Sequence, residues 1–157
     1  MKFSQLILEA KFTNGKFFGN LGAGILPFCS TTKNFLINLR SSRTNESNTY
    51  GVWGGAINIE NPSVSEIKKE ALRELQEESQ FKGKMNLISS FVFSKSNFKY
   101  YNFIGIVKKE FIPKLDLESS GFKWINLKEI KQLPNLHFGL KALINSSKFK
   151  EQIKNYE

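Results

Sequence analysis

Runs of apolar residues separated by polar turns predict several strands on both sides of one long helix. Two of the turns are polar segments at residues 31–34 and 95–97. The apolar runs are rich in Phe, Ile, Val and Tyr, which favours strands over helices. The predicted strands are residues 22–28, 35–40, 85–94, 98–107 and 122–125.

The long helix is predicted to begin near Ser63. Ser63 and Glu66 have the spacing of a capping box, in which each side chain bonds the other residue's backbone N–H. On a helical wheel the apolar residues form one stripe, and Glu78 lies at its edge, where a carboxylate is partly desolvated. Apolar residues at helical spacing in 137–143 predict a second helix, followed by a polar, charged tail.

This order of elements predicts an α/β fold in which helices cover both faces of a sheet. The length of 157 residues and the hydrophobic content of 40% suit one domain spanning residues 1–157. Near the start, Asn14-Gly15 between two apolar runs predicts a hairpin turn.

The composition indicates in which cellular compartment the protein is expected. No apolar stretch approaches membrane-spanning length, so we expect neither a membrane span nor a signal peptide. The single cysteine, Cys29, excludes an intramolecular disulfide, and with the lone His137 it has no metal-binding spacing. A reducing compartment, the cytoplasm, fits this composition best.

A formal net charge of +9 favours attraction of polyanions. A nucleotide or nucleic-acid substrate explains this charge, and solubility explains it equally well. The basic residues are spread along the chain, without an arginine-rich arm or an RNA-binding signature.

The helix carries a dense acidic segment at residues 73–78. Glu74, Glu77 and Glu78 crowd one region and repel one another by roughly a few tenths of a kcal/mol per pair. A hard divalent cation such as Mg²⁺ takes oxygen ligands, and it would turn this repulsion into coordination. The alternative is a solvated acidic face on which Arg73 and Glu77 form an ordinary ion pair.

Two adjacent glycines, Gly54 and Gly55, follow an aromatic residue and precede the helix. Glycines allow main-chain groups to approach a ligand closely, so this loop can meet the carboxylates of the helix. Without the acidic helix, the pair would indicate only a turn or a bulge.

Residues 73–81, Arg-Glu-Leu-Gln-Glu-Glu-Ser-Gln-Phe, resemble the second half of the Nudix hydrolase motif, Arg-Glu-hydrophobic-x-Glu-Glu-x-Gly-hydrophobic. Gln80 stands where the family usually has Gly. The segment from Gly55 to Arg73 is four residues longer than the family pattern, and Glu60 matches the first motif glutamate only when counted from Gly54. The resemblance covers most of residues 20–145 and implies a Nudix-like α/β/α sandwich with a central mixed sheet.

The resemblance implies a hydrolase in which water attacks a phosphorus of a nucleoside diphosphate derivative with the help of Mg²⁺, with Mn²⁺ as the alternative ion. Glu74, Glu77 and Glu78 are then expected as metal ligands, with the main-chain carbonyl of Gly55 as a further one. Arg73 would orient the carboxylates, and the choice of catalytic base among the glutamates stays open.

Further site residues follow less directly. Glu118, in a later loop, is a candidate ligand or base, with a solvated glutamate as the alternative. Arg40 is expected to meet a phosphate or to form a surface ion pair. Gly54 and Trp53 are candidate substrate contacts, although aromatic residues in strands, including Tyr100 and Phe103, more often belong to the core.

Three functions remain open on the sequence alone. The first is hydrolysis of free nucleotides or their conjugates, and the second is removal of a cap or pyrophosphate from an RNA 5′ end. The third is a Nudix module that binds nucleotide or RNA without hydrolysing it. The family resemblance also makes a homodimer an option.

Overall fold

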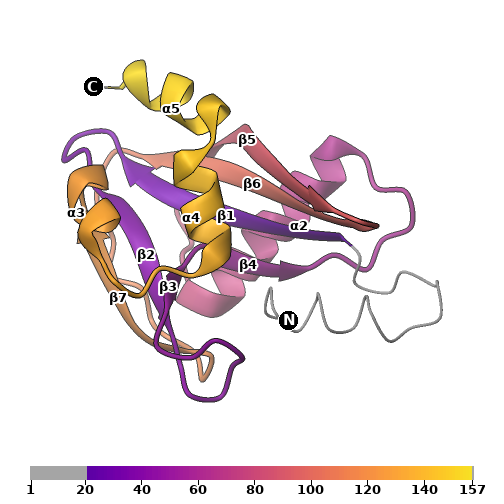
Figure 1. Ribbon diagram of the computed structural model, residues 1–157, viewed down its shortest axis with the longest axis horizontal. Coiled ribbons are helices and arrows are strands. Elements are labelled where there is room, and N and C mark those ends of the chain that lie inside the picture. Colours follow the sequence, from indigo (N-terminus) through magenta and orange to yellow (C-terminus); the bar gives the residue numbers. More distant parts are fainter. Residues whose placement is uncertain (1–20, 157) are drawn as a thin grey trace.

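A computed structural model describes residues 21–156, so the hairpin predicted around Asn14-Gly15 lies outside the described residues. Figure 1 shows a sheet with helices on both faces. The strands are β1 (Leu21–Cys29), β2 (Phe35–Arg40), β3 (Tyr50–Gly51), β4 (Trp53–Ala56), β5 (Asn86–Lys95), β6 (Phe98–Val107) and β7 (Ser119–Ile125). The helices are α2 (Val64–Ser79), α3 (Leu127–Gln132), α4 (Phe138–Asn145) and α5 (Ser147–Lys154).

The sheet is mixed. Its strand order is β3-β2-β1-β6-β5, with β4 paired to β1 and β7 paired to β2. Strand β1 runs antiparallel to β2 and β4 but parallel to β6. Helix α2 packs on β1 and β4, while α4 and α5 lie on the opposite side (Figure 1). The α/β/α sandwich expected from the sequence is therefore confirmed.

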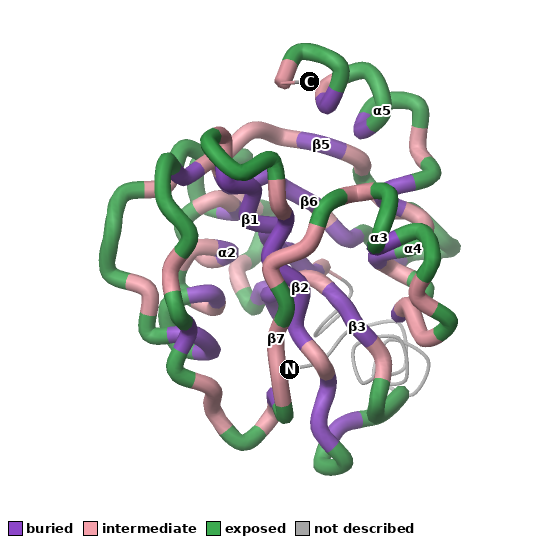
Figure 2. The backbone as a smooth tube through the Cα atoms, turned by 90° about the vertical axis from the view of Figure 1, so that its left-hand side faces the viewer, coloured by how far each residue is buried: buried purple, intermediate pink, exposed green. Residues whose placement is uncertain are grey.

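Alternation along β1 divides the core between the two faces of the sheet. Ala23 and Ile25 belong to the cluster that includes Leu75 of α2. Leu26 belongs to the second cluster, which includes Leu140 of α4. Figure 2 shows the buried positions concentrated along the strands, with exposed positions in the connecting loops.

The main helix begins as the sequence predicted. Ser63 is its N-cap, and both hydrogen bonds of the capping box with Glu66 are present. The predicted antiparallel pair is also confirmed, because β5 pairs antiparallel with β6.

The polar, charged tail forms a helix that the sequence did not predict, α5. Phe149 and Ile153, four residues apart, are both buried against the sheet face that carries α4. Two apolar residues at this spacing are enough to dock one face of a short helix, although its composition is mainly polar. Within residues 21–156, no helix is long and apolar enough to cross a membrane.

The candidate site lies where two strands diverge. Strands β1 and β2 pair at Phe28 and Phe35. Away from this pair the two strands separate, because residues 22–25 of β1 pair with β4 and residues 38–39 of β2 pair with β3. Asn38 of β2 and Gly54 of β4 both hydrogen-bond the last part of α2 across this divergence.

Candidate active site

Glu78 is buried near the C-terminal end of α2, with 2% of its surface exposed. The backbone N–H of Gly54 donates to its Oε1 at 3.2 Å, and Nδ2 of Asn38 lies 3.5 Å from its Oε2. Hydrogen bonds are what make burial of a carboxylate tolerable. The prediction that Glu78 is desolvated beside the apolar stripe is confirmed.

Only glycine fits at position 54. A Cβ there would collide with the carbonyl oxygen of Ala23 and would lie 2.7 Å from the Tyr100 hydroxyl. The close approach of β4 to β1 therefore depends on the missing side chain. This approach holds the Gly54 amide where it meets Glu78.

The register of β4 decides which glycine carbonyl faces the helix. The N–H of Ile57 donates to Leu21 of β1, so Gly55, two residues earlier, also directs its main-chain groups to β1. Gly54 directs its N–H to Glu78, and its carbonyl lies on the same edge of the strand. The edge near the carboxylates thus carries the Gly54 carbonyl, whereas the sequence pointed to Gly55.

Arg73 binds the other glutamates on this face of α2. Its guanidinium donates to Glu70 and Glu74, each at 3.0 Å, and to Glu77. The hydrogen bond that Arg73 donates to Glu70 is the largest of the influences that raise the pKa of Arg73. The expected orienting contact of Arg73 with Glu74 and Glu77 is present, and it extends to Glu70.

Glu74 has an environment different from that of Glu77. The side chain of Glu74 is 14% exposed and that of Glu77 is 59% exposed. Burial raises the pKa of Glu74, and the charges of Glu77 and Glu118 raise it further, while Arg73 opposes the shift. A carboxyl group of raised pKa is a better proton acceptor once it is ionised.

The donor set suits a hard divalent cation, because Glu74, Glu77 and Glu78 offer only oxygen ligands. Within residues 21–156, however, no group of three His, Cys, Asp or Glu side chains is arranged to hold a metal ion. The reason is visible in the contacts: Arg73 binds Glu74 and Glu77, while Glu78 points to Gly54. The residues fit such an ion in chemical type, but the Arg73 guanidinium occupies the carboxylates of Glu74 and Glu77.

Glu118 lies in the loop before β7 and influences the helix electrostatically. Its N–H donates to Oδ1 of Asp116 at 2.9 Å, and its carbonyl accepts from the N–H of Ser41 at 2.9 Å. Its charge contributes to the raised pKa of Glu74. The structure thus brings Glu118 toward the helix carboxylates, although they are distant in sequence.

Arg40 is buried, with 5% of its surface exposed, so it does not lie on the surface. Its Nε and Nη2 donate to the carbonyl of Asn45 at 3.1 and 2.6 Å. These two hydrogen bonds connect the Arg40 side chain to the loop after β2. Burial lowers the pKa of Arg40, and nearby acidic groups, among them Glu46 and Glu78, oppose this shift.

Trp53 belongs to the core. Its ring is fully buried, and its indole N–H donates to the carbonyl of Leu36 at 3.1 Å. Phe103 is 1% exposed in the same cluster. Neither ring presents a face to a nucleobase, so the suggested substrate contact of Trp53 does not agree with its burial.

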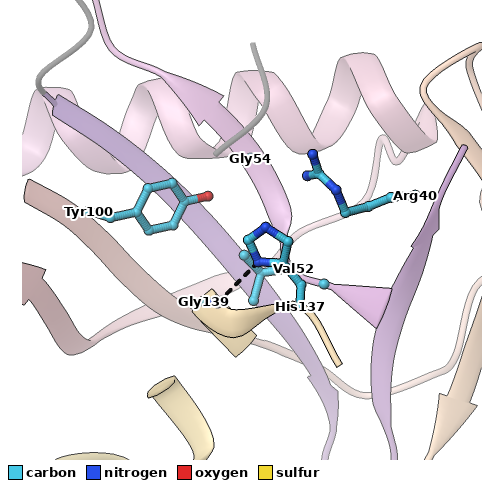
Figure 3. Close-up of a pocket in the computed structure, with 7 residues that line it drawn as sticks. Arg40, Val52, Gly54, Tyr100, His137 and Gly139 are labelled. Carbon is cyan, nitrogen blue, oxygen red and sulfur yellow. Dashed lines mark hydrogen bonds between the residues drawn. The ribbon is translucent and has the colours of Figure 1, made fainter. Parts of the chain in front are cut away.

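A small pocket opens beside Gly54, on the side where α4 begins. Figure 3 shows the Tyr100 hydroxyl and the Arg40 side chain approaching it from different strands, with His137 between them. The pocket lining consists of Arg40, Gly51, Val52, Gly54, Tyr100, His137 and Gly139. Burial, followed by the charge of Glu78, raises the pKa of the Tyr100 hydroxyl.

His137 closes this pocket by two contacts that the sequence did not predict. Its Nδ1 accepts the N–H of Gly139 at 3.1 Å, so Nε2 carries the ring proton and faces Oε2 of Glu46 at 2.7 Å. A lone histidine just before a helix was the available signal, because such a position can cap the helix.

Comparison with solved structures identifies the fold. The MutT protein of Methanosarcina mazei is 19% identical, with a TM-score of 0.63 over 85% of this chain and 94% of that chain. An Ap4A hydrolase of C. elegans is 16% identical, with a TM-score of 0.62 over 86% and 98% of the two chains. The Nudix domain of Shewanella oneidensis NrtR, solved with ADP ribose, is 15% identical, with a TM-score of 0.59 over 98% and 99%.

The chain therefore has the Nudix hydrolase fold. No protein-family model matches the sequence, and no curated protein matches it significantly. The likeness is one of structure, and at these identities it establishes the fold alone.

Proposed function

We propose that this protein is a metal-dependent Nudix hydrolase that cleaves a diphosphate linkage in a nucleotide or a nucleotide conjugate. The observation that carries the proposal is the buried Glu78, held by the Gly54 amide beside Glu74 and Glu77. A helix built only for packing gains nothing from a buried carboxylate at this position. In a chain of Nudix fold, a cation site explains it.

Glu74, Glu77 and Glu78 would hold Mg²⁺ or Mn²⁺, with the carbonyl of Gly54 on the adjoining edge and Glu118 as a further donor. Such an ion supplies positive charge against the phosphate oxygens of the substrate. Arg73 binds Glu74 and Glu77. To bind the ion, these two carboxylates would have to release the guanidinium. Before the ion binds, Arg73 would act as the counter-charge that holds the carboxylates of Glu74 and Glu77 in place.

Glu74 is the residue we favour as general base. Its side chain is only 14% exposed, so its carboxylate is largely shielded from bulk water. It would accept the proton of the attacking water, whose oxygen forms the new bond to phosphorus as the bridging oxygen leaves. Glu77, which is more exposed, would serve as a ligand.

The non-reacting part of the substrate would extend toward the pocket lined by Arg40, Tyr100 and His137. A buried guanidinium near this pocket favours an anionic or polar group there. One similar structure is named as an Ap4A hydrolase and another was solved with ADP ribose, which supports a nucleotide. The net charge of +9 would attract any such polyanion, including an RNA 5′ end.

A non-catalytic nucleotide-binding module is the second candidate. The observation in its favour is that Arg73 occupies Glu74 and Glu77, so residues 21–156 contain no preformed group of metal ligands. This candidate predicts nucleotide binding that is independent of divalent metal.

Turnover of a substrate panel separates these possibilities. Ap4A, ADP-ribose, nucleoside triphosphates and 5′-triphosphate RNA are incubated with the native chain in Mg²⁺ or in EDTA. The proposal predicts Mg²⁺-dependent cleavage of one or more of them and its loss in Glu77→Gln. Glu70→Gln is the matched control, because Glu70 also contacts Arg73 but is no proposed ligand. Binding without turnover of any substrate would establish the binding module instead.

A further inference from the structure

Asn38 links two parts of the candidate site that are far apart in sequence. It is buried in β2, with 1% of its surface exposed. Its Nδ2 lies 3.5 Å from Oε2 of Glu78, and its Oδ1 accepts from the hydroxyl of Ser119 at 3.0 Å. Ser119 is also buried and directly follows Glu118. The amide thus stands between the helix carboxylate and the loop that carries Glu118.

The chemistry of the three groups fixes the orientation of this amide. An ionised Glu78 only accepts hydrogen bonds, so the donor end of Asn38 must face it. The acceptor end then faces Ser119, whose hydroxyl donates. The contact with Glu78 therefore fixes the orientation of the Asn38 amide, and the Ser119 hydroxyl donates to the oxygen at its other end.

Neither aspartate nor leucine reproduces both contacts. Aspartate at position 38 would place a second buried carboxylate against Glu78, and the two charges would repel each other. Leucine would leave both Glu78 Oε2 and the Ser119 hydroxyl without this partner, at a desolvation cost. An asparagine in an otherwise apolar strand is therefore explained by these two neighbours.

The loop that precedes Ser119 is also held by hydrogen bonds. The N–H of Glu118 is bonded to Asp116, and its carbonyl is bonded to Ser41. The hydroxyl of Ser119 is the contact that joins this loop to Asn38 and, through it, to Glu78. Displacing Asn38 would shift Glu78 and Glu118 relative to each other.

We propose that Asn38, together with Ser119, is a positioning residue that sets the relative placement of Glu78 and Glu118 for metal binding. This inference rests on the proposed function, since it assigns these carboxylates to a cation. Removing a residue that hydrogen-bonds a metal-ligating carboxylate typically lowers the metal affinity about 10- to 100-fold.

The test compares two neighbouring serines of β7. Ser119→Ala removes the contact with Asn38, while Ser120→Ala, the matched control, alters an exposed hydroxyl 3.5 Å from the Leu39 carbonyl. Mn²⁺ affinity is measured by electron paramagnetic resonance, and the Gly54 amide resonance reports the placement of Glu78 without metal. Asn38→Asp, which keeps the shape of the side chain, provides a second variant.

Ser119→Ala is expected to weaken Mn²⁺ binding roughly 10- to 100-fold and to shift the Gly54 amide resonance. It should lower kcat at fixed Mg²⁺ while leaving the KM for the nucleotide unchanged, and Asn38→Asp should have a larger effect. Ser120→Ala should match the native chain in every measurement.

Native Mn²⁺ affinity in both Ser119→Ala and Asn38→Asp overturns the positioning role and leaves the proposed function standing. A shifted Gly54 resonance with native Mn²⁺ affinity also overturns it, because the contact would then be structural only. If the native chain binds no Mn²⁺ and cleaves nothing, the proposed function falls and the inference falls with it.

Discussion

The backbone N–H of Gly54 donates to Oε1 of Glu78 at 3.2 Å, and this contact joins strand β4 to the end of helix α2. It is possible because β4 approaches β1 so closely that position 54 has no room for a side chain. The packing of β4 against β1 and the placement of the Glu78 carboxylate therefore both depend on Gly54. Changes at Gly54 should affect stability and activity together.

Gly54→Ala should destabilise the fold by about 3 kcal/mol or more, because the added Cβ collides with the backbone of β1. Urea unfolding measures this change. Gly121→Ala is the control, since a Cβ there would lie 3.6 Å from Leu39, an ordinary contact distance. Equal stability of the two variants would contradict the close approach of β4 to β1.

Gln80→Gly should stabilise the fold by about 1 kcal/mol. Gln80 ends α2 in the left-handed conformation, with φ 57° and ψ 24°, where a side chain is strained and glycine is not. Chemical denaturation provides the measurement, and Gln80→Ala, which keeps a Cβ, should give no comparable gain. A destabilised Gln80→Gly would mean that contacts of the glutamine side chain outweigh the strain.

Arg73→Ala should lower the free energy of unfolding by about 0.5 to 1 kcal/mol in metal-free buffer. The effect is small because the Arg73 side chain is 46% exposed and its ion pairs are screened by salt. Mg²⁺ should raise the melting temperature of the variant more than that of the native chain, because the ion replaces the lost positive charge. Equal shifts in both proteins would show that Arg73 and the ion do not share carboxylates.

Glu46 should give the fold a recognisable pH dependence. Burial raises the pKa of its carboxyl group, and Arg40 only partly opposes this shift. The folded chain therefore takes up this proton at higher pH than the unfolded chain does. Stability should fall as the pH rises from the ordinary glutamate pKa through the raised one.

Glu46→Gln isolates this contribution, since glutamine has nearly the same shape as glutamate but carries no titratable carboxyl group. The variant should gain stability relative to the native chain as the pH rises from about 4 to 7. Urea unfolding at several pH values is the measurement. A constant difference between the two chains across this range would contradict the raised pKa.

Much of the fold followed from local patterns in the sequence. The capping box at Ser63 and the apolar stripe of α2 located the helix and also the burial of Glu78. These features depend on residues within a few turns of one another, so periodicity and capping chemistry suffice to predict them. The helix α5 was missed because its buried residues are Phe149 and Ile153, and two apolar residues give a weak periodic signal.

The supports of the candidate site could not be predicted in the same way. Asn38 and Glu78 are 40 residues apart, and Asn38 and Ser119 are 81 apart, so their contacts depend on tertiary packing. The parallel pairing of β1 with β6 is equally non-local. One local signal existed, namely a polar residue within the apolar strand that contains Asn38, because buried polar groups require partners.

Mn²⁺ binding to the native chain and to Glu78→Gln tests the central claim most directly. Glutamine keeps an oxygen for the Gly54 amide but removes the charge, so the fold should persist while Mn²⁺ affinity falls at least about 100-fold. Glu70→Gln, measured alongside, should bind Mn²⁺ as the native chain does. Equal Mn²⁺ affinity in the native chain and Glu78→Gln would contradict the assignment of this buried carboxylate to a metal site.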